Sequence, residues 1–164
     1  MNDLNNKPIC LIYQPLGIGD VFFCQGIGKH YLDRGYRVIW PLASHVMYLK
    51  DYIDSPEVEF VDILSDFPGK DKYMIQYNDP WALHPMNTDG DFVFLSLSNA
   101  QYRVKDSSLM ISKYDLVGLD FRTWRDNFKF IRNSKESTIK RYCIIKTTFY
   151  RCKLCNRSIK WYIK

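Results

Sequence analysis

The sequence has little of several features that would place it in a special class of protein. Runs without a charged residue reach at most 12 members, as in residues 8–19, fewer than the roughly 20 apolar residues that a membrane-spanning helix requires. The first residues, MNDLNNKP, are polar, so we expect no secretory signal peptide. Only five residues are cysteine, which argues against a disulfide scaffold. These absences favour a cytoplasmic protein with reduced thiols.

The chain does contain enough apolar material for one folded domain. Of its 164 residues, 46% are hydrophobic, 16% are aromatic and 25% are charged. This composition excludes global disorder and a coiled coil, because such chains bury little apolar surface or repeat a heptad. The length is that of a single globular domain.

Acidic residues are absent from the last 28 residues of the chain. Residues 1–136 carry a net charge of −3, whereas residues 137–164 carry +8. Gly, Ala, Val, Asp and Glu, whose codons all begin with G, supply 37 of the first 136 residues and none of the last 28. A reading-frame change in an AT-rich gene explains this pattern. The alternative is an authentic basic tail, whose interleaved aromatic residues bind nucleic acid or an anionic membrane surface.

The order of apolar segments predicts an α/β fold for residues 1–136. The first part of the chain predicts strands at 8–14, 36–40 and 58–63, and helices at 20–34 and 44–53. Strands and helices that alternate with short connections predict a doubly wound parallel sheet with right-handed crossovers. Farther along, the pattern predicts strands at 73–77 and 92–97, a loop at 78–91 and an amphipathic helix at 120–134.

The turn after the first strand carries the clearest chemical signal. Its sequence, LGIGDVFF, places Gly17 and Gly19 before a helix, where free backbone N–H groups attract phosphate or developing negative charge. Both glycines are therefore candidate substrate-binding residues. Asp20 lies at the carboxyl edge of the predicted sheet, where a carboxylate can accept a proton from a substrate hydroxyl. The alternative for Asp20 is a structural role as the N-cap of the helix.

Motifs for cofactors and metals are incomplete in this chain. The dinucleotide fingerprint needs a third glycine where Phe22 stands, and an acid at the end of the second strand, where the chain reads WPL. No Gly-Lys-Ser/Thr sequence follows the turn. Cys152 and Cys155 form a lone CxxC pair far from every histidine, so a four-ligand zinc site is not indicated. We therefore expect neither a cofactor nor a metal.

The opening segment, LGIGDVFFCQGIGKHYLDRGYRVIWPLASHVMYLKDY, resembles the heptosyltransferase-type glycosyltransferases of the GT-B class. The shared features are a Gly-Asp pair after the first strand and an R-G-Y-x-V-x-W second strand. Later, SKYDLVGLDFRTWRDNFKFIRNSKES resembles the segment that leads toward the inter-domain connection in that family. The resemblance covers residues 1–136. It implies a Rossmann-like domain, the acceptor-side half of the two-domain GT-B architecture.

The resemblance also implies an activity, which is the metal-independent transfer of a sugar from a nucleotide sugar to an acceptor hydroxyl. Asp20 is then the catalytic base. His45 is a candidate acceptor-binding residue, and Arg122 and Arg125 are candidates for binding an anionic acceptor or the diphosphate; the alternative for all three is a solvated surface.

The chain departs from the family in two respects. Gln25-Gly26 replaces a Thr-Pro element, and we expect the donor-binding domain to be missing, which leaves the chain inactive alone. The contrasting hypothesis is a non-catalytic α/β protein that binds nucleic acid or an anionic surface through residues 137–164. We favour the glycosyltransferase interpretation, and therefore do not expect nucleic acid to be the partner.

Overall fold

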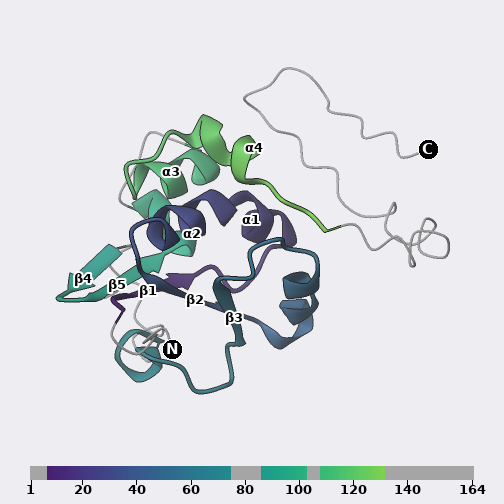
Figure 1. Ribbon diagram of the computed structural model, residues 1–164. Helices are drawn as coiled ribbons and strands as arrows, with labels where there is room; N and C mark the ends of the chain where they lie inside the picture. The colour runs from purple at the N-terminus through teal and green to yellow at the C-terminus, as the bar shows by residue number, and fades with distance from the viewer. Residues whose placement is uncertain (1–6, 75–85, 103–107, 132–164) are drawn as a thin grey trace. The chain divides into compact units, whose positions relative to one another are not determined.

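A computed structural model describes residues 7–74, 86–102 and 108–131 (Figure 1). Five strands form one sheet in the order β3-β2-β1-β5-β4. Four of them are parallel, and β4 pairs antiparallel with β5 at one edge. The strands are β1 (Ile9–Tyr13), β2 (Arg37–Leu42), β3 (Val58–Asp62), β4 (Met86–Asp89) and β5 (Phe92–Ser96). The predicted α/β class is confirmed, whereas the sheet, which was predicted as parallel, is only mostly parallel because β4 runs antiparallel to β5.

The helices are short and of several types. The α-helices are α1 (Ile18–Phe23), α2 (Gln25–Leu32), α3 (Leu109–Asp115) and α4 (Trp124–Asn127). The described ranges also contain the 3₁₀ helices η2 (Ser44–Asp51), η5 (Leu97–Tyr102) and η6 (Phe121–Thr123), and the π-helical turn η3 (Lys70–Met74). Within the described ranges, no helix has the length and apolar character needed to cross a bilayer.

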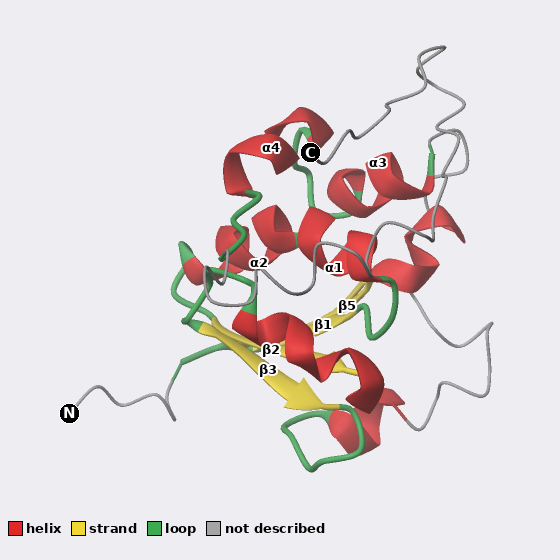
Figure 2. Ribbon diagram, turned by 90° about the vertical axis from the view of Figure 1, so that its right-hand side faces the viewer, coloured by secondary structure: helices red, strands yellow, loops and turns green. Residues whose placement is uncertain are grey.

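The core lies on both faces of the sheet, in two clusters of unequal size. The four α-helices cover one face (Figures 1 and 2), where Ile12 and Trp40 from the strands pack with Tyr114 from α3. The opposite face holds a smaller cluster that includes Leu11 and Tyr73, the latter from η3. Apolar strand sequences such as ICLIY are expected for strands that are covered on both faces.

The single helix predicted at 20–34 is two helices that meet at Cys24. The first helix begins at Ile18, with Gly17 at the N-cap position and no side-chain capping hydrogen bond. Asp20 lies within the first turn of this helix, so the expectation that it serves as the N-cap is wrong. Gly35 ends the helical segment, because it has a positive φ of 84° and its N–H donates to the Leu32 carbonyl at 2.9 Å.

Other predicted elements differ in type or extent. The helix at 44–53 is the 3₁₀ helix η2. Of the helix predicted at 120–134, residues 120–131 are described, and within them the helical residues belong to η6 and to α4, which ends at Asn127. Residues 73–74 belong to the π turn η3, and residues 75–77 lie outside the described residues. The predicted loop at 78–91 contains β4, which a two-residue turn with Gly90 at φ 55° joins to β5.

The chain divides into two units by its internal contacts. The first unit comprises residues 1–131 and the second comprises residues 132–164. The second unit, which includes the predicted basic tail at 137–164, lies outside the described residues. Both interpretations of the tail therefore stay predictions.

Candidate functional site

The carboxyl end of β1 lies where the order of the parallel strands reverses. From β1 the chain proceeds to β2 and β3 on one side, and it later returns to place β5 on the other side. Open α/β sheets bind their ligands in the crevice at such a reversal point, outside the carboxyl ends of the strands. The Gly17 turn and α1 follow β1 at this edge. The fold thus places the predicted Asp20 site where ligands bind in this class of sheet.

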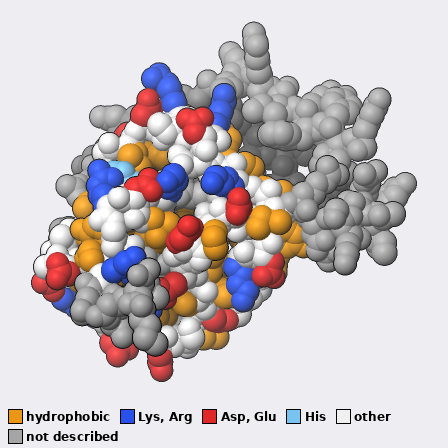
Figure 3. Space-filling model, in the orientation of Figure 1, with side chains coloured by type: hydrophobic (Ala, Val, Ile, Leu, Met, Phe, Trp, Pro, Cys, Tyr) orange, Lys and Arg blue, Asp and Glu red, His pale blue; other side chains and the backbone are white. Residues whose placement is uncertain are grey.

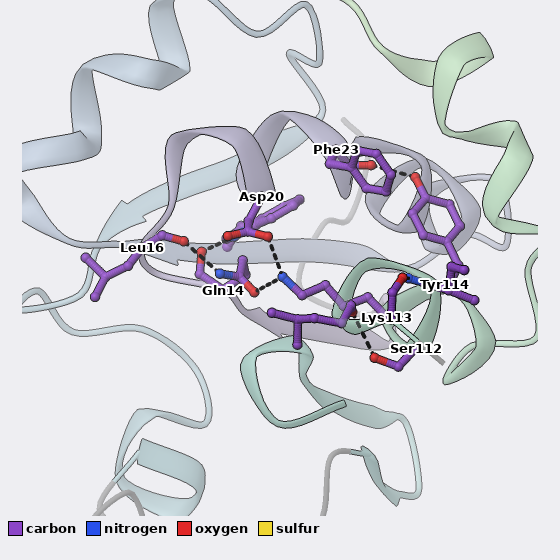
Figure 4. A network of polar contacts seen from close by, with 11 residues as sticks. Gln14, Leu16, Asp20, Phe23, Ser112, Lys113 and Tyr114 are labelled. Carbon is purple, nitrogen blue, oxygen red and sulfur yellow. Dashed lines mark hydrogen bonds and ion pairs between the residues drawn. The ribbon is translucent and has the colours of Figure 1, made fainter. Parts of the chain in front are cut away.

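Asp20 belongs to a buried polar network that joins β1, α1 and α3 (Figure 4). The Lys113 ammonium donates to Asp20 Oδ1 at 2.8 Å and to Gln14 Oε1 at 2.9 Å. The Lys113 side chain is 1% exposed, whereas that of Asp20 is 29% exposed. A buried ammonium requires a compensating charge. Asp20 supplies that charge and still presents part of its carboxylate to solvent.

Neighbouring backbone groups fix Gln14 in this network. Its Nε2 donates to the Leu16 carbonyl at 2.7 Å, which leaves Oε1 to face the Lys113 ammonium. The Trp40 indole N–H donates to the Gln14 carbonyl at 3.1 Å and is buried with it. Gln14, the residue that follows β1, is therefore held through both its backbone and its side chain.

α3 carries Lys113 and is fixed at both of its ends. The Ser108 hydroxyl accepts from the Ile111 N–H at 3.4 Å as an N-cap. The Tyr114 hydroxyl donates to the Phe23 carbonyl at 2.6 Å, which ties α3 to the last turn of α1. Tyr114 is fully buried. These contacts determine where the Lys113 ammonium lies relative to Asp20.

Gly17 is required by the position of the Asp20 carboxylate. Its φ is +84°, in the region that favours glycine, and a Cβ at this position would overlap Asp20 Oδ2. A Cβ at Gly19 would meet no atom within 4 Å. The structure therefore gives Gly17 a steric role beneath the carboxylate, and substrate binding by both glycines stays a prediction.

Cys24 follows α1, and its thiol is fully buried. Burial raises its pKa to about 12; Lys113 acts to lower that pKa and Asp20 acts to raise it further. Because the thiolate is the nucleophile, a buried thiol with this pKa is inert at neutral pH. Cys24 is therefore part of the core.

The other predicted site residues make local contacts. His45 is exposed on η2, which follows the carboxyl end of β2. The Arg122 side chain is 87% exposed and lies 3.9 Å from Asp120, and the Arg125 guanidinium lies 5.7 Å from the Trp124 ring centre. Figure 3 shows acidic and basic side chains interspersed over one face of the molecule. Substrate binding by these three residues stays a prediction.

Gln25 and Gly26, where the chain departs from the resembling family, have packing roles. Gln25 accepts from the Lys129 N–H and donates to the Lys129 carbonyl, both at 3.3 Å. A Cβ on Gly26 would lie 2.9 Å from the Tyr114 hydroxyl and 3.2 Å from Asn127 Nδ2. Because Gly26 has no side chain, α2 can lie close to α3 and α4 at this position.

Comparisons with known proteins add no further assignment. A scan against protein-family models, a search of curated proteins and a search of solved structures each returned no match. Among the described residues, no group of three or more His, Cys, Asp or Glu side chains could hold a metal ion. Cys152 and Cys155 lie outside the described residues. The function is therefore argued from the Asp20 network.

Proposed function

We propose that residues 1–136 form the Rossmann-like, acceptor-side domain of a GT-B glycosyltransferase, in which Asp20 is the general base. The observation that carries the proposal is the Asp20 carboxylate itself. It follows β1 at the strand reversal and is held by a buried lysine, and the Asp20 side chain is still 29% exposed. The Gly-Asp pair after the first strand supports the same assignment.

The proposed reaction is a displacement at the anomeric carbon of a nucleotide sugar. The acceptor oxygen forms a bond to that carbon, and the bond from the carbon to the nucleoside diphosphate breaks. Asp20 takes the proton of the acceptor hydroxyl as the new bond forms. The electron pair of the broken bond stays on the departing nucleoside diphosphate. We place the binding site for this diphosphate on a second, donor-binding domain.

The two oxygens of Asp20 have different surroundings, and this suits the proposed role. Oδ1 accepts from the Lys113 ammonium at 2.8 Å. Oδ2 lies over Gly17, at a position with no side chain. A base must lie within hydrogen-bond reach of the proton that it removes. Lys113 therefore fixes one oxygen, and the second is the oxygen that we assign to the acceptor hydroxyl.

Asp20 also has a structural role, so the experiment must separate catalysis from folding. We would join the chain to a GT-B donor-binding domain and measure kcat with UDP, GDP and ADP sugars. In the double variant Asp20→Asn with Lys113→Met, both charges are removed together, which avoids an unpaired buried ammonium. We expect kcat to fall by about 10² to 10⁴, the usual contribution of general acid–base catalysis.

A matched control is available on α2. Asp33→Asn removes a carboxylate that also pairs with a lysine, but on the exposed surface. This variant should keep the parent kcat. A folded double variant with the kcat of the parent protein would exclude Asp20 as the base.

The contrasting function, binding of nucleic acid or an anionic surface, depends on residues 137–164. These residues lie outside the described part of the chain, and no observation on the described residues favours it. Binding that weakens steeply with salt would identify it, because phosphate contacts release counterions. A neutral acceptor site would be nearly insensitive to salt.

A further inference from the structure

β3 forms one edge of the five-stranded sheet (Figure 2). A groove of about 620 Å³ lies beside it, lined in part by Ile53, Pro56 and residues 58–61. Natural proteins protect sheet edges with lysine, proline or a bulge, because an open edge pairs with other strands. The sequence of β3, VEFVD, contains neither residue type, and its register with β2 is continuous. This edge is therefore competent for pairing.

The ladder between β2 and β3 shows which backbone groups of β3 point outward. The Ile63 N–H donates to the Leu42 carbonyl of β2 at 2.9 Å. Because the peptide groups of a strand alternate in direction, odd-numbered residues of β3 direct their N–H and C=O toward β2. The even-numbered residues, Val58, Phe60 and Asp62, direct theirs outward.

Neighbouring turns already satisfy part of this outward edge. The Val58 N–H donates to the Ser55 carbonyl at 3.1 Å, and the Asp62 carbonyl accepts from the Ser65 N–H at 2.9 Å. Among the described residues, the outward groups left without a backbone partner are the Val58 C=O, both groups of Phe60 and the Asp62 N–H. Two donors and two acceptors remain, arranged symmetrically about Phe60.

We propose that this edge is a dimer interface, in which β3 pairs antiparallel with β3 of a second copy around a two-fold axis at Phe60. In this register the two Phe60 residues exchange both of their N–H···O=C bonds. The Asp62 N–H of each copy donates to the Val58 carbonyl of the other. Each remaining outward group gains a partner, as an isologous interface requires. The edge is self-complementary, and a second copy satisfies all of these groups at once.

The charges on β3 are compatible with this pairing. Across the two-fold axis, Glu59 lies opposite Val61, and Asp62 lies opposite Val58, so no two carboxylates face each other directly. Arg37 also neutralises Glu59 within each copy, through N···O distances of 2.6 and 2.7 Å. The sheet would continue across the interface with no two carboxylates directly opposite each other.

The first test uses the full chain. Sedimentation across a wide concentration range should show a monomer–dimer equilibrium. Hydrogen exchange, followed amide by amide, should show protection of Phe60 and Asp62 that rises with concentration. The Ile63 amide, which is bonded within the sheet, should be protected at every concentration. A chain that stays monomeric throughout would overturn the proposal.

Two variants locate the interface. Phe60→Lys keeps an aliphatic stem against Trp40, whose ring centre lies 5.7 Å from that of Phe60, but places two ammonium groups at the axis. The dimer should be lost, whereas Thr88→Lys on the opposite edge strand β4 should leave it intact. If Phe60→Lys does not fold, Val61→Glu serves the same purpose, because it places a carboxylate directly opposite Glu59 of the other copy. A dimer that persists in the folded variant overturns the proposal.

Pairing of β3 with the chain's own residues 132–164 is the competing outcome. It predicts that Phe60 is protected at all concentrations and becomes exchangeable when the chain is cut back to residue 131. That result would also overturn the dimer. Neither outcome depends on sugar transfer, so the proposed function is tested separately.

Discussion

Two lysine–aspartate pairs in this molecule have nearly the same length but different surroundings. Lys113 and Asp20 lie 2.8 Å apart with side chains 1% and 29% exposed, whereas Lys29 and Asp33 lie 2.7 Å apart with side chains 53% and 60% exposed. Water solvates both charges of the exposed pair, so that pair contributes little. Removing one member of the buried pair leaves an uncompensated charge. The two pairs therefore differ in burial and not in distance. Burial gives the Lys113–Asp20 pair a structural role and makes it a candidate catalytic pair, whereas the Lys29–Asp33 pair is a surface contact.

The largest expected effect comes from Asp20→Asn, which breaks the buried pair. An amide cannot balance the Lys113 ammonium, so the free energy of unfolding should fall by about 3 kcal/mol. Urea denaturation measures this loss. In the double variant with Lys113→Met, most of the stability should return, because both charges are absent. If Asp20→Asn alone keeps the parent midpoint, the buried pair is not needed for the fold.

Gly17→Ala tests the same pair through the backbone. The added Cβ would overlap Asp20 Oδ2, and alanine disfavours a φ of +84°. We expect a loss of about 2 kcal/mol, from strain and from displacement of the carboxylate. Gly19→Ala is the matched control, because its Cβ meets no atom within 4 Å. Thermal unfolding of both variants checks the prediction, and equal midpoints would contradict it.

Gly26→Ala acts on the buried pair from a greater distance. Its Cβ would lie 2.9 Å from the hydroxyl of Tyr114, the residue next to Lys113 on α3. Crowding at this contact should cost about 1 to 2 kcal/mol, as overpacking of a core usually does. Combining the change with Tyr114→Phe, which removes the crowded oxygen, should recover part of the loss in urea denaturation. A Gly26→Ala variant as stable as the parent would refute the close approach.

The smallest effect is expected from Asp33→Asn, which breaks the exposed pair. The free energy of unfolding should change by less than about 0.5 kcal/mol, because exposed pairs are screened by water and salt. Urea denaturation at low and high salt gives the measurement. A loss as large as that of Asp20→Asn would remove the distinction between the two pairs.

Much of the sheet could be predicted from apolar runs such as ICLIY and FVFLS, which are long enough to mark buried strands. β4 was missed because its residues, MNTD, carry turn-forming side chains, and its pairing with β5 supplies the structure that local propensity does not. The helix at 20–34 was predicted as one element because apolar spacing continues through Cys24. Periodicity does not detect such a change of axis.

The Asp20 site was predicted in part. The Gly-Asp pair indicated the Asp20 carboxylate and the glycine turn before it, because these residues are neighbours in the sequence. Gln14 and Lys113 were missed, because their meeting depends on tertiary packing. A signal for Lys113 did exist in LMISKYD, where one basic residue stands in a largely apolar turn. Such a lysine needs a buried partner, but the sequence does not say which acid provides it.

The ion pair between Asp20 and Lys113 also constrains the order in which this molecule acquires its candidate site. The two residues are separated by 93 positions, so the contact closes a long loop at an entropic cost that grows with loop length. During synthesis, Asp20 leaves the ribosome well before its counter-charge exists. The carboxylate therefore reaches its final environment only after β5 and α3 have been made and docked. The candidate site is, on this basis, completed late, and an amino-terminal folding intermediate would lack it.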